Sequence, residues 1–224
     1  MGKICTLAIP TSIEGISTTI DVGSGCIHHA VFDSGISRNR MYSIIRNSDF
    51  RSSHVHLVTD NLQEYMSSTI DYIGMTITPH VRDIVSEFIA LLYSLKSEVD
   101  IRYSTLNDTN NKNFEYYNIW LDPKRYYKME PMVICWLGAD KILKQMNHEE
   151  TYELLKTFLR LGQVTGVTLL LHSDKPYGIH EAVDNDIYAQ FVQINIPATK
   201  HAEDITALIG DKEYHTSVVQ KDMV

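Results

Sequence analysis

The chain has 224 residues, 44% of them hydrophobic and 21% charged, which suits one α/β domain, or two small ones, with an ample core. Its formal net charge of −8 and its lack of a basic run argue against a nucleic-acid partner held through phosphates. The three cysteines have no C-x-x-C spacing, which suits a reducing compartment. No signal peptide or apolar run of membrane length occurs, so we expect any membrane association to come from another segment or a partner.

Short β-branched segments in the first part of the chain predict strands separated by turns. The segments are residues 4–9, 17–22, 27–32, 53–59 and 71–76. A tight polar stretch follows residues 27–32, and a helix is expected from about Ser37. Strand, loop and helix in this order are the layout of a P-loop, whose backbone N–H groups hold phosphate at a helix N-terminus.

Residues 32–39, FDSGISRN, depart from the P-loop pattern G-x-x-x-x-G-K-[ST] at nearly every position, and by themselves they predict an ordinary turn. Phe32 and Ser37 stand at the glycine positions, and Arg38 replaces the lysine. Asn39 stands where a hydroxyl would hold Mg²⁺. If the loop is a degenerate nucleotide site, its candidate contacts are Asp33, Ser34, Gly35, Ser37, Arg38 and Asn39.

The clearest helix begins at Thr78-Pro79, where Thr78 is a plausible N-cap and Pro79 occupies the first helical position. Apolar residues at helical spacing predict that it runs to about Glu98. A polar loop is expected at residues 108–113, followed by an aromatic segment. We interpret its rings as packing residues, with a binding surface as the alternative; they are Tyr116, Tyr117, Trp120, Tyr126 and Tyr127.

The C-terminal half alternates buried strands with helices. The apolar run at residues 131–137 is typical of a central parallel strand, and Asn147 with Glu150 predicts a capped helix start. Further segments predict strands at 167–171, 191–196 and 214–219 and a helix at 201–209. The whole pattern predicts a three-layer α/β fold whose parallel sheet contains residues 27–32, 53–58, 132–136, 167–171 and 191–196.

The order of these patterns resembles the FtsK/SpoIIIE-type ATPase domains, over nearly the whole chain. Residues 32–39 fall at the Walker A position, and the strand ending HLVTD has an acidic residue, Asp60, where the family has one. Residues 132–137 followed by Asp140 resemble the Walker B strand, and residues 160–176, RLGQVTGVTLLLHSDKP, resemble a later helix-end, strand and turn. The chain is most similar to the degenerate C-terminal ATPase modules of EssC/EccC, the motor proteins of type VII secretion. The resemblance implies one RecA/FtsK-like domain over residues 1–224.

Phosphoryl transfer needs a phosphate-binding loop with a lysine, a hydroxyl on Mg²⁺ and a Walker B acid. At the end of the candidate Walker B strand the acid is replaced by Leu137 and Gly138. We therefore predict that the domain does not hydrolyse ATP, has no resident cofactor, and binds ATP and Mg²⁺ weakly if at all. Two further positions match the family: Asp140, interpreted as a helix-start or surface acid, and His172, interpreted as a strand-end histidine at the nucleotide-sensing position.

The resemblance also implies partners: neighbouring ATPase domains of the same chain, secreted WXG100-type substrates or their C-terminal signal, and a hexamer of the full-length protein, without nucleic acid. It implies a place on the cytoplasmic side of the cell membrane, as part of a membrane-anchored protein. One alternative is an active ATP-driven translocase with an atypical P-loop. A histidine-based phosphodiesterase, suggested by His215, and a zinc site near His54 and His56 are further alternatives.

Overall fold

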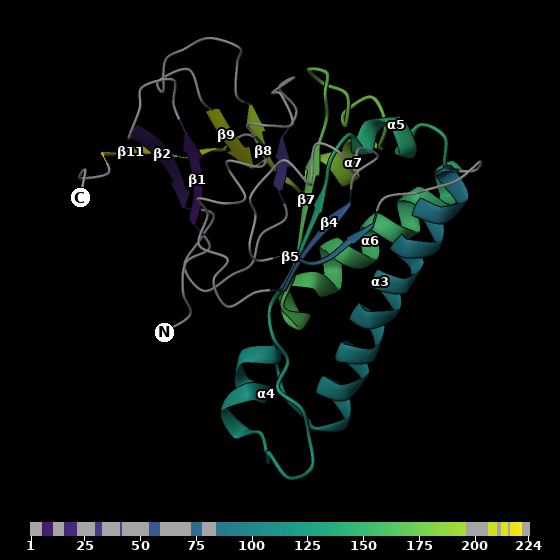
Figure 1. The fold of residues 1–224 in the computed structure, drawn as a ribbon, viewed down its shortest axis with the longest axis vertical. Coiled ribbons are helices and arrows are strands. Elements are labelled where there is room, and N and C mark those ends of the chain that lie inside the picture. Colours follow the sequence, from purple (N-terminus) through teal and green to yellow (C-terminus); the bar gives the residue numbers. More distant parts are fainter. Residues whose placement is uncertain are drawn as a thin grey trace.

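The computed structural model describes residues 84–195 continuously, together with Met41 and the strands that lie before and after that range (Figure 1). An eight-stranded sheet in the order β10-β9-β8-β3-β7-β6-β4-β5 forms its centre. The strands from β8 to β5 in that order run parallel to their neighbours. They are β8 (Val192–Asn195), β3 (Ala30–Phe32), β7 (Val167–His172), β6 (Met132–Trp136), β4 (His54–Val58) and β5 (Ile73–Ile77). The predicted parallel sheet is therefore confirmed.

The end of the chain adds antiparallel strands to this sheet. Strand β9 (Thr206–Ile209) pairs with β8, and β10 (Lys212–Tyr214) pairs with β9. The helix predicted at 201–209 is therefore wrong over residues 206–209, which form a strand. The edge of β8 supplies hydrogen-bond partners for their backbone, and the local helical pattern of the sequence does not reveal this long-range pairing. Residues 201–205 lie outside the described part.

A second, three-stranded sheet contains β1 (Thr6–Pro10), β2 (Ile16–Asp21) and β11 (Thr216–Gln220). Both of its pairings are antiparallel, with β2 in the middle. The two N-terminal strands are confirmed as strands. The last strand, predicted at 214–219, is confirmed over residues 216–219 in β11, whereas Tyr214 belongs to β10 in the large sheet.

Helix α6 (His148–Thr165) packs on β7, and α3 (Ile84–Asp108) packs on α6 (Figure 1). The predicted cap of α6 is confirmed, since the Asn147 side chain accepts a hydrogen bond from the N–H of Glu149. Between these helices and the sheet lies the main core, whose largest fully buried side chains include Trp136, Phe158 and Phe191. Two short helices, α5 (Ala139–Leu143) and α7 (Asn185–Tyr188), lie beside this core.

Helix α3 continues to Asp108, beyond the predicted end at Glu98, because both its apolar face and its ion pairs continue. Arg102 pairs with Glu98 one turn earlier, and Leu106 is buried. A turn then leads to α4 (Phe114–Trp120), a helix that sequence analysis did not predict. Figure 1 shows α4 at the lower end of the molecule, beside the C-terminal end of α3.

Candidate functional site

The parallel strands place the predicted site residues at one edge of the sheet, since the carboxyl ends of parallel strands lie together. Phe32, the last residue of β3, pairs with His172, the last residue of β7. Trp136, the last residue of β6, pairs with Leu171 on one side and Val58 on the other. The candidate Walker A and Walker B strands therefore lie on either side of β7, and His172 lies between their ends.

The six candidate nucleotide contacts of the loop lie outside the described residues, so their role stays a prediction. They are Asp33, Ser34, Gly35, Ser37, Arg38 and Asn39. The structure describes the residue before this loop, Phe32 in β3, and one residue after it. That residue, Met41, is helical and almost fully buried, which agrees with the predicted strand–loop–helix order.

Leu137, which was predicted to stand in place of the Walker B acid, directly follows β6. Its side chain is buried, and its backbone N–H donates to the Val58 carbonyl, with 2.9 Å between nitrogen and oxygen. Gly138 then turns the chain into α5 with a left-handed φ of 65°, a conformation that glycine adopts without strain from a Cβ. The strand therefore ends in an apolar side chain and a tight turn.

Asp140 lies in the first turn of α5 and is only 3% exposed. Its interpretation as a helix-start residue is confirmed, and its interpretation as a surface acid is wrong. Its Oδ1 atom has no hydrogen-bond partner among the residues described, an unusual state for a buried carboxylate oxygen. Its Oδ2 atom lies against Gly178, where an added Cβ would come within 3.0 Å of it. The turn after β7 therefore packs directly on this carboxylate.

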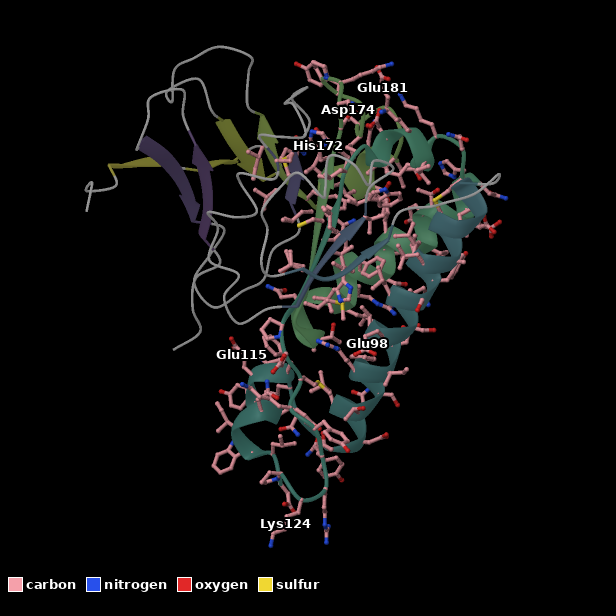
Figure 2. The ribbon with its side chains drawn as sticks, in the orientation of Figure 1. Glu98, Glu115, Lys124, His172, Asp174 and Glu181 are labelled. Carbon is pink, nitrogen blue, oxygen red and sulfur yellow. The ribbon has the colours of Figure 1, made fainter. Side chains whose placement is uncertain are left out.

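His172 is fully buried at the end of β7, as a strand-end histidine is expected to be. The Gly138 N–H donates to its Nδ1 atom over 3.4 Å, and Asp174 Oδ1 lies 4.0 Å from the same nitrogen. Lys141 of α5 in turn forms an ion pair with Asp174, with 2.6 Å between Nζ and Oδ2. These contacts join α5 to the end of β7, where Figure 2 shows His172 and Asp174 close together.

Ser173 belongs to the same cluster, although sequence analysis did not select it. It is fully buried, and its Oγ atom accepts a hydrogen bond of 3.0 Å from the Lys175 N–H. A Cβ added to Gly178 would lie 2.0 Å from this Oγ atom, so the serine and the glycine are in close contact. The polar pair His172-Ser173, directly after the apolar run of residues 169–171, was the sequence signal that could have identified it.

The fold thus brings together Leu137, Asp140 and His172, and adds Ser173 and Gly178. The polar side chains of this cluster are all buried, so the cluster orders the turn between β7 and Gly178. Among the residues described, no group of three or more His, Cys, Asp or Glu side chains is arranged to hold a metal ion. None of the described helices is long and apolar enough to cross a membrane.

No protein-family model matches the sequence, and no curated protein sequence matches it either. Solved structures do match. The conjugation coupling protein TcpA of pCW3, solved as a monomer with ATPγS, is 15% identical with a TM-score of 0.61, over 99% of this chain and 68% of TcpA. ATPases 2 and 3 of EssC from Geobacillus thermodenitrificans are 12% identical with a TM-score of 0.63, over 100% of this chain and 48% of that one.

A third match is to ATPases 2 and 3 of EccC from Thermomonospora curvata, solved in complex with a signal sequence peptide. It is 9% identical with a TM-score of 0.59, over 94% of this chain and 42% of EccC. The chain therefore has the fold of the EssC/EccC and FtsK-like ATPase domains, which confirms the predicted fold class and the resemblance. It spans about half the length of the EssC and EccC chains it matches.

Proposed function

We propose that this chain is a non-catalytic FtsK/SpoIIIE-like module of a type VII secretion motor. In this role it regulates neighbouring ATPase domains or engages the C-terminal signal of a secreted WXG100-type substrate. The observation that carries the proposal is the end of β6, where a buried leucine, Leu137, stands in place of the acid that would hold Mg²⁺ through water or directly. Without that acid, the divergent loop at residues 32–39 has no partner for phosphoryl transfer.

The buried cluster supports the same proposal. The first carboxylate after β6 is Asp140, which packs against Gly178, while His172 is enclosed at the end of β7. Contacts between α5 and the turn after β7, such as the Lys141–Asp174 ion pair, hold the carboxyl-end edge of the sheet in one arrangement. A rigid edge of this kind suits a domain that others dock on.

The partners of the proposal follow from the fold shared with multidomain motors. The solved EssC and EccC chains each contain ATPases 2 and 3, and the EccC structure holds a signal sequence peptide. We propose the same classes of partner here: neighbouring ATPase domains, within a hexamer of the full-length protein, and a substrate signal peptide. The module would then act on the cytoplasmic side of the membrane that anchors the parent protein.

The experiment that tests the proposal is a thermal-unfolding series with Mg-ATP. A ligand at a hundred times its Kd stabilises a protein by about 2.7 kcal/mol, which for a chain of this length raises Tm by about 5–11 °C. We expect no rise at millimolar Mg-ATP compared with Mg²⁺ alone. A saturable rise would contradict the prediction that ATP binds weakly if at all. C-terminal peptides of WXG100-type proteins, with scrambled peptides as controls, test substrate engagement in the same assay.

The alternative is an ATPase that uses an atypical P-loop, and one observation favours it. The Oδ1 atom of Asp140 has no hydrogen-bond partner within the described part of the chain. An acid that binds a metal ion from a shifted position would be in the same state before its cation binds. The matched pair of variants is Asp140→Asn and Asp174→Asn, since Asp174 is a partly exposed acid of the same edge. ATP turnover that Asp140→Asn abolishes and Asp174→Asn retains would establish this alternative.

A further inference from the structure

The segment from α4 to residue 128 displays large apolar side chains to solvent. We call this set the aromatic tip: Tyr116, Ile119, Trp120, Tyr126 and Tyr127. Trp120 is 77% exposed and Tyr127 is 94% exposed, whereas most aromatic side chains of this size are largely buried. The interpretation of these rings as packing residues is therefore wrong for Tyr116, Trp120 and Tyr127, whereas Tyr117 is buried and the half-exposed Tyr126 packs edge-on against it. An exposed group of large apolar side chains marks an interaction surface.

The aromatic tip is built before any partner arrives. Beneath it lies a small separate core of Leu106, Phe114, Tyr117 and Met129. The amide of Asn118 bonds Met129 twice, donating to its carbonyl over 2.6 Å and accepting from its N–H over 2.8 Å. The Tyr117 hydroxyl donates to the Tyr127 carbonyl over 3.1 Å. Binding through this tip therefore needs little additional ordering of the chain.

The tip carries positive charge in an acidic protein. The segment from α4 to residue 128 contains Lys124, Arg125 and Lys128 against two acids, Glu115 and Asp122, for a net charge of +1. The whole chain has a net charge of −8, so the remaining residues carry −9. A partner that binds the tip should therefore present an apolar pocket with negative charge at its rim. An anionic membrane would instead repel most of this acidic chain.

The same molecule contains such a hollow. A pocket of about 250 Å³ lies between α5, the start of α6 and residues 181–187, and we call it the acidic pocket. Its walls include Leu143, Met146, Leu155 and Ile187. Thr151, which also lines it, is 5% exposed, and its hydroxyl has no hydrogen-bond partner among the residues that the structure describes. A buried hydroxyl of this kind favours a ligand that brings a polar atom as well as apolar surface.

Two acidic side chains, Glu181 and Asp184, line this pocket. The neighbouring first turns of α6 and residue 186 add four carboxylates that do not line it: Glu149, Glu150, Glu153 and Asp186. Three contacts lie at the rim. Lys144, directly after α5, pairs with Glu181, and His148 of α6 pairs with Asp184, both at 2.7 Å; the Tyr152 hydroxyl donates to Asp186 at 3.2 Å. The acids outnumber the cations in these contacts, so the rim keeps a net negative charge.

The aromatic tip and the acidic pocket lie at opposite ends of the molecule. Figure 2 shows Lys124 of the tip region at one end of the longest axis and Glu181 of the pocket rim at the other. A chain cannot place its own tip in its own pocket, whereas a second copy can. We infer that the aromatic tip of one copy docks in the acidic pocket of the next.

In this contact an aromatic ring fills the apolar pocket, and a tyrosine hydroxyl of the tip reaches the Thr151 hydroxyl. Lys124 and Lys128 face the carboxylates of the rim. The two surfaces differ, so the contact is head-to-tail and repeats from copy to copy, closing into a ring or extending as a filament. This inference does not depend on nucleotide binding, so a failure of the Mg-ATP test leaves it standing.

Sedimentation velocity of the 224-residue chain over a concentration series tests it. We expect reversible association with a Kd between about 1 μM and 1 mM. The tip variant Trp120→Ser/Tyr127→Ser and the pocket variant Glu181→Lys/Asp186→Lys should each weaken association by about 30-fold or more, the loss expected for hot-spot residues. Tyr93→Ser, which removes an exposed ring of α3 outside the tip, should leave it unchanged. Thermal unfolding of each variant shows that it is folded.

The decisive measurement mixes the tip variant with the pocket variant. One working pocket and one working tip remain between them, so the mixture should form a 1:1 heterodimer and nothing larger. A wild-type chain that stays monomeric throughout would refute the inference. So would a mixture without heterodimers, which is the result expected if tips pair with tips. Tip-dependent binding to phosphatidylglycerol vesicles by a monomeric chain would assign the tip to a membrane instead, and would equally overturn it.

Discussion

Gly178→Ala is the substitution that most directly tests the packing of the candidate site. The added methyl group would lie 2.0 Å from Ser173 Oγ and 3.0 Å from Asp140 Oδ2. Both distances are shorter than nonbonded contact allows, so the serine hydroxyl must rotate away. That rotation also breaks its hydrogen bond with the Lys175 N–H.

The expected loss of stability follows from these two effects. Forcing a methyl group into a packed site costs about 1–3 kcal/mol, and losing a hydrogen bond costs about 0.5–1.5 kcal/mol. We expect a total of about 3 kcal/mol, which lowers Tm by about 6–12 °C for a chain of this length. Urea unfolding followed by tryptophan fluorescence measures it, because Trp136 lies in the neighbouring strand β6.

A double-mutant cycle with Ser173→Ala isolates the cause. Without the hydroxyl, the nearest atoms that remain are Asp140 Oδ2 and the β-carbon of residue 173, each at 3.0 Å. Gly178→Ala should then cost about 1 kcal/mol, so the coupling energy is about 2 kcal/mol. Equal costs in the two backgrounds, within about 0.5 kcal/mol, would refute the account of this cluster.

Two further predictions concern the structure under the aromatic tip. Gly166→Ala should destabilise the chain by about 2–4 kcal/mol, because φ is +78° there and a Cβ would lie 2.9 Å from the Phe114 ring. Calorimetry measures this loss of stability. A loss below about 1 kcal/mol would contradict the stated contacts. Burial, with a smaller contribution from Tyr126, raises the pKa of the Tyr117 hydroxyl above its usual 10.0. The free energy of unfolding that this hydroxyl contributes is fully present below the pKa that Tyr117 has in the unfolded chain. It is lost as the pH rises through the higher pKa that Tyr117 has in the folded chain. Tyr117→Phe should therefore make the urea midpoint fall less steeply above pH about 10, and an unchanged slope would refute the assignment.

Local sequence was sufficient wherever the deciding interactions are themselves local. The apolar runs of β6 and β7 predict buried parallel strands because both faces of such strands are covered. Asn147 was predicted as a cap from its spacing to Glu150, and the backbone N–H that it accepts, that of Glu149, is only two residues away. The order of strands and helices was enough to predict the fold class and the resemblance to FtsK-like ATPases.

Other features depended on partners that are distant in the sequence. Residues 206–209 form a strand because β8 offers them a free edge, and Asp140 is buried because the turn at Gly178 packs on its carboxylate. The exposure of Trp120 is likewise decided by the small core that holds α4 at the end of α3. By itself, the sequence determined which segments are strands and helices in the parallel core. Only the tertiary structure decided which polar groups are enclosed and which rings are exposed, because both depend on contacts between segments far apart along the chain.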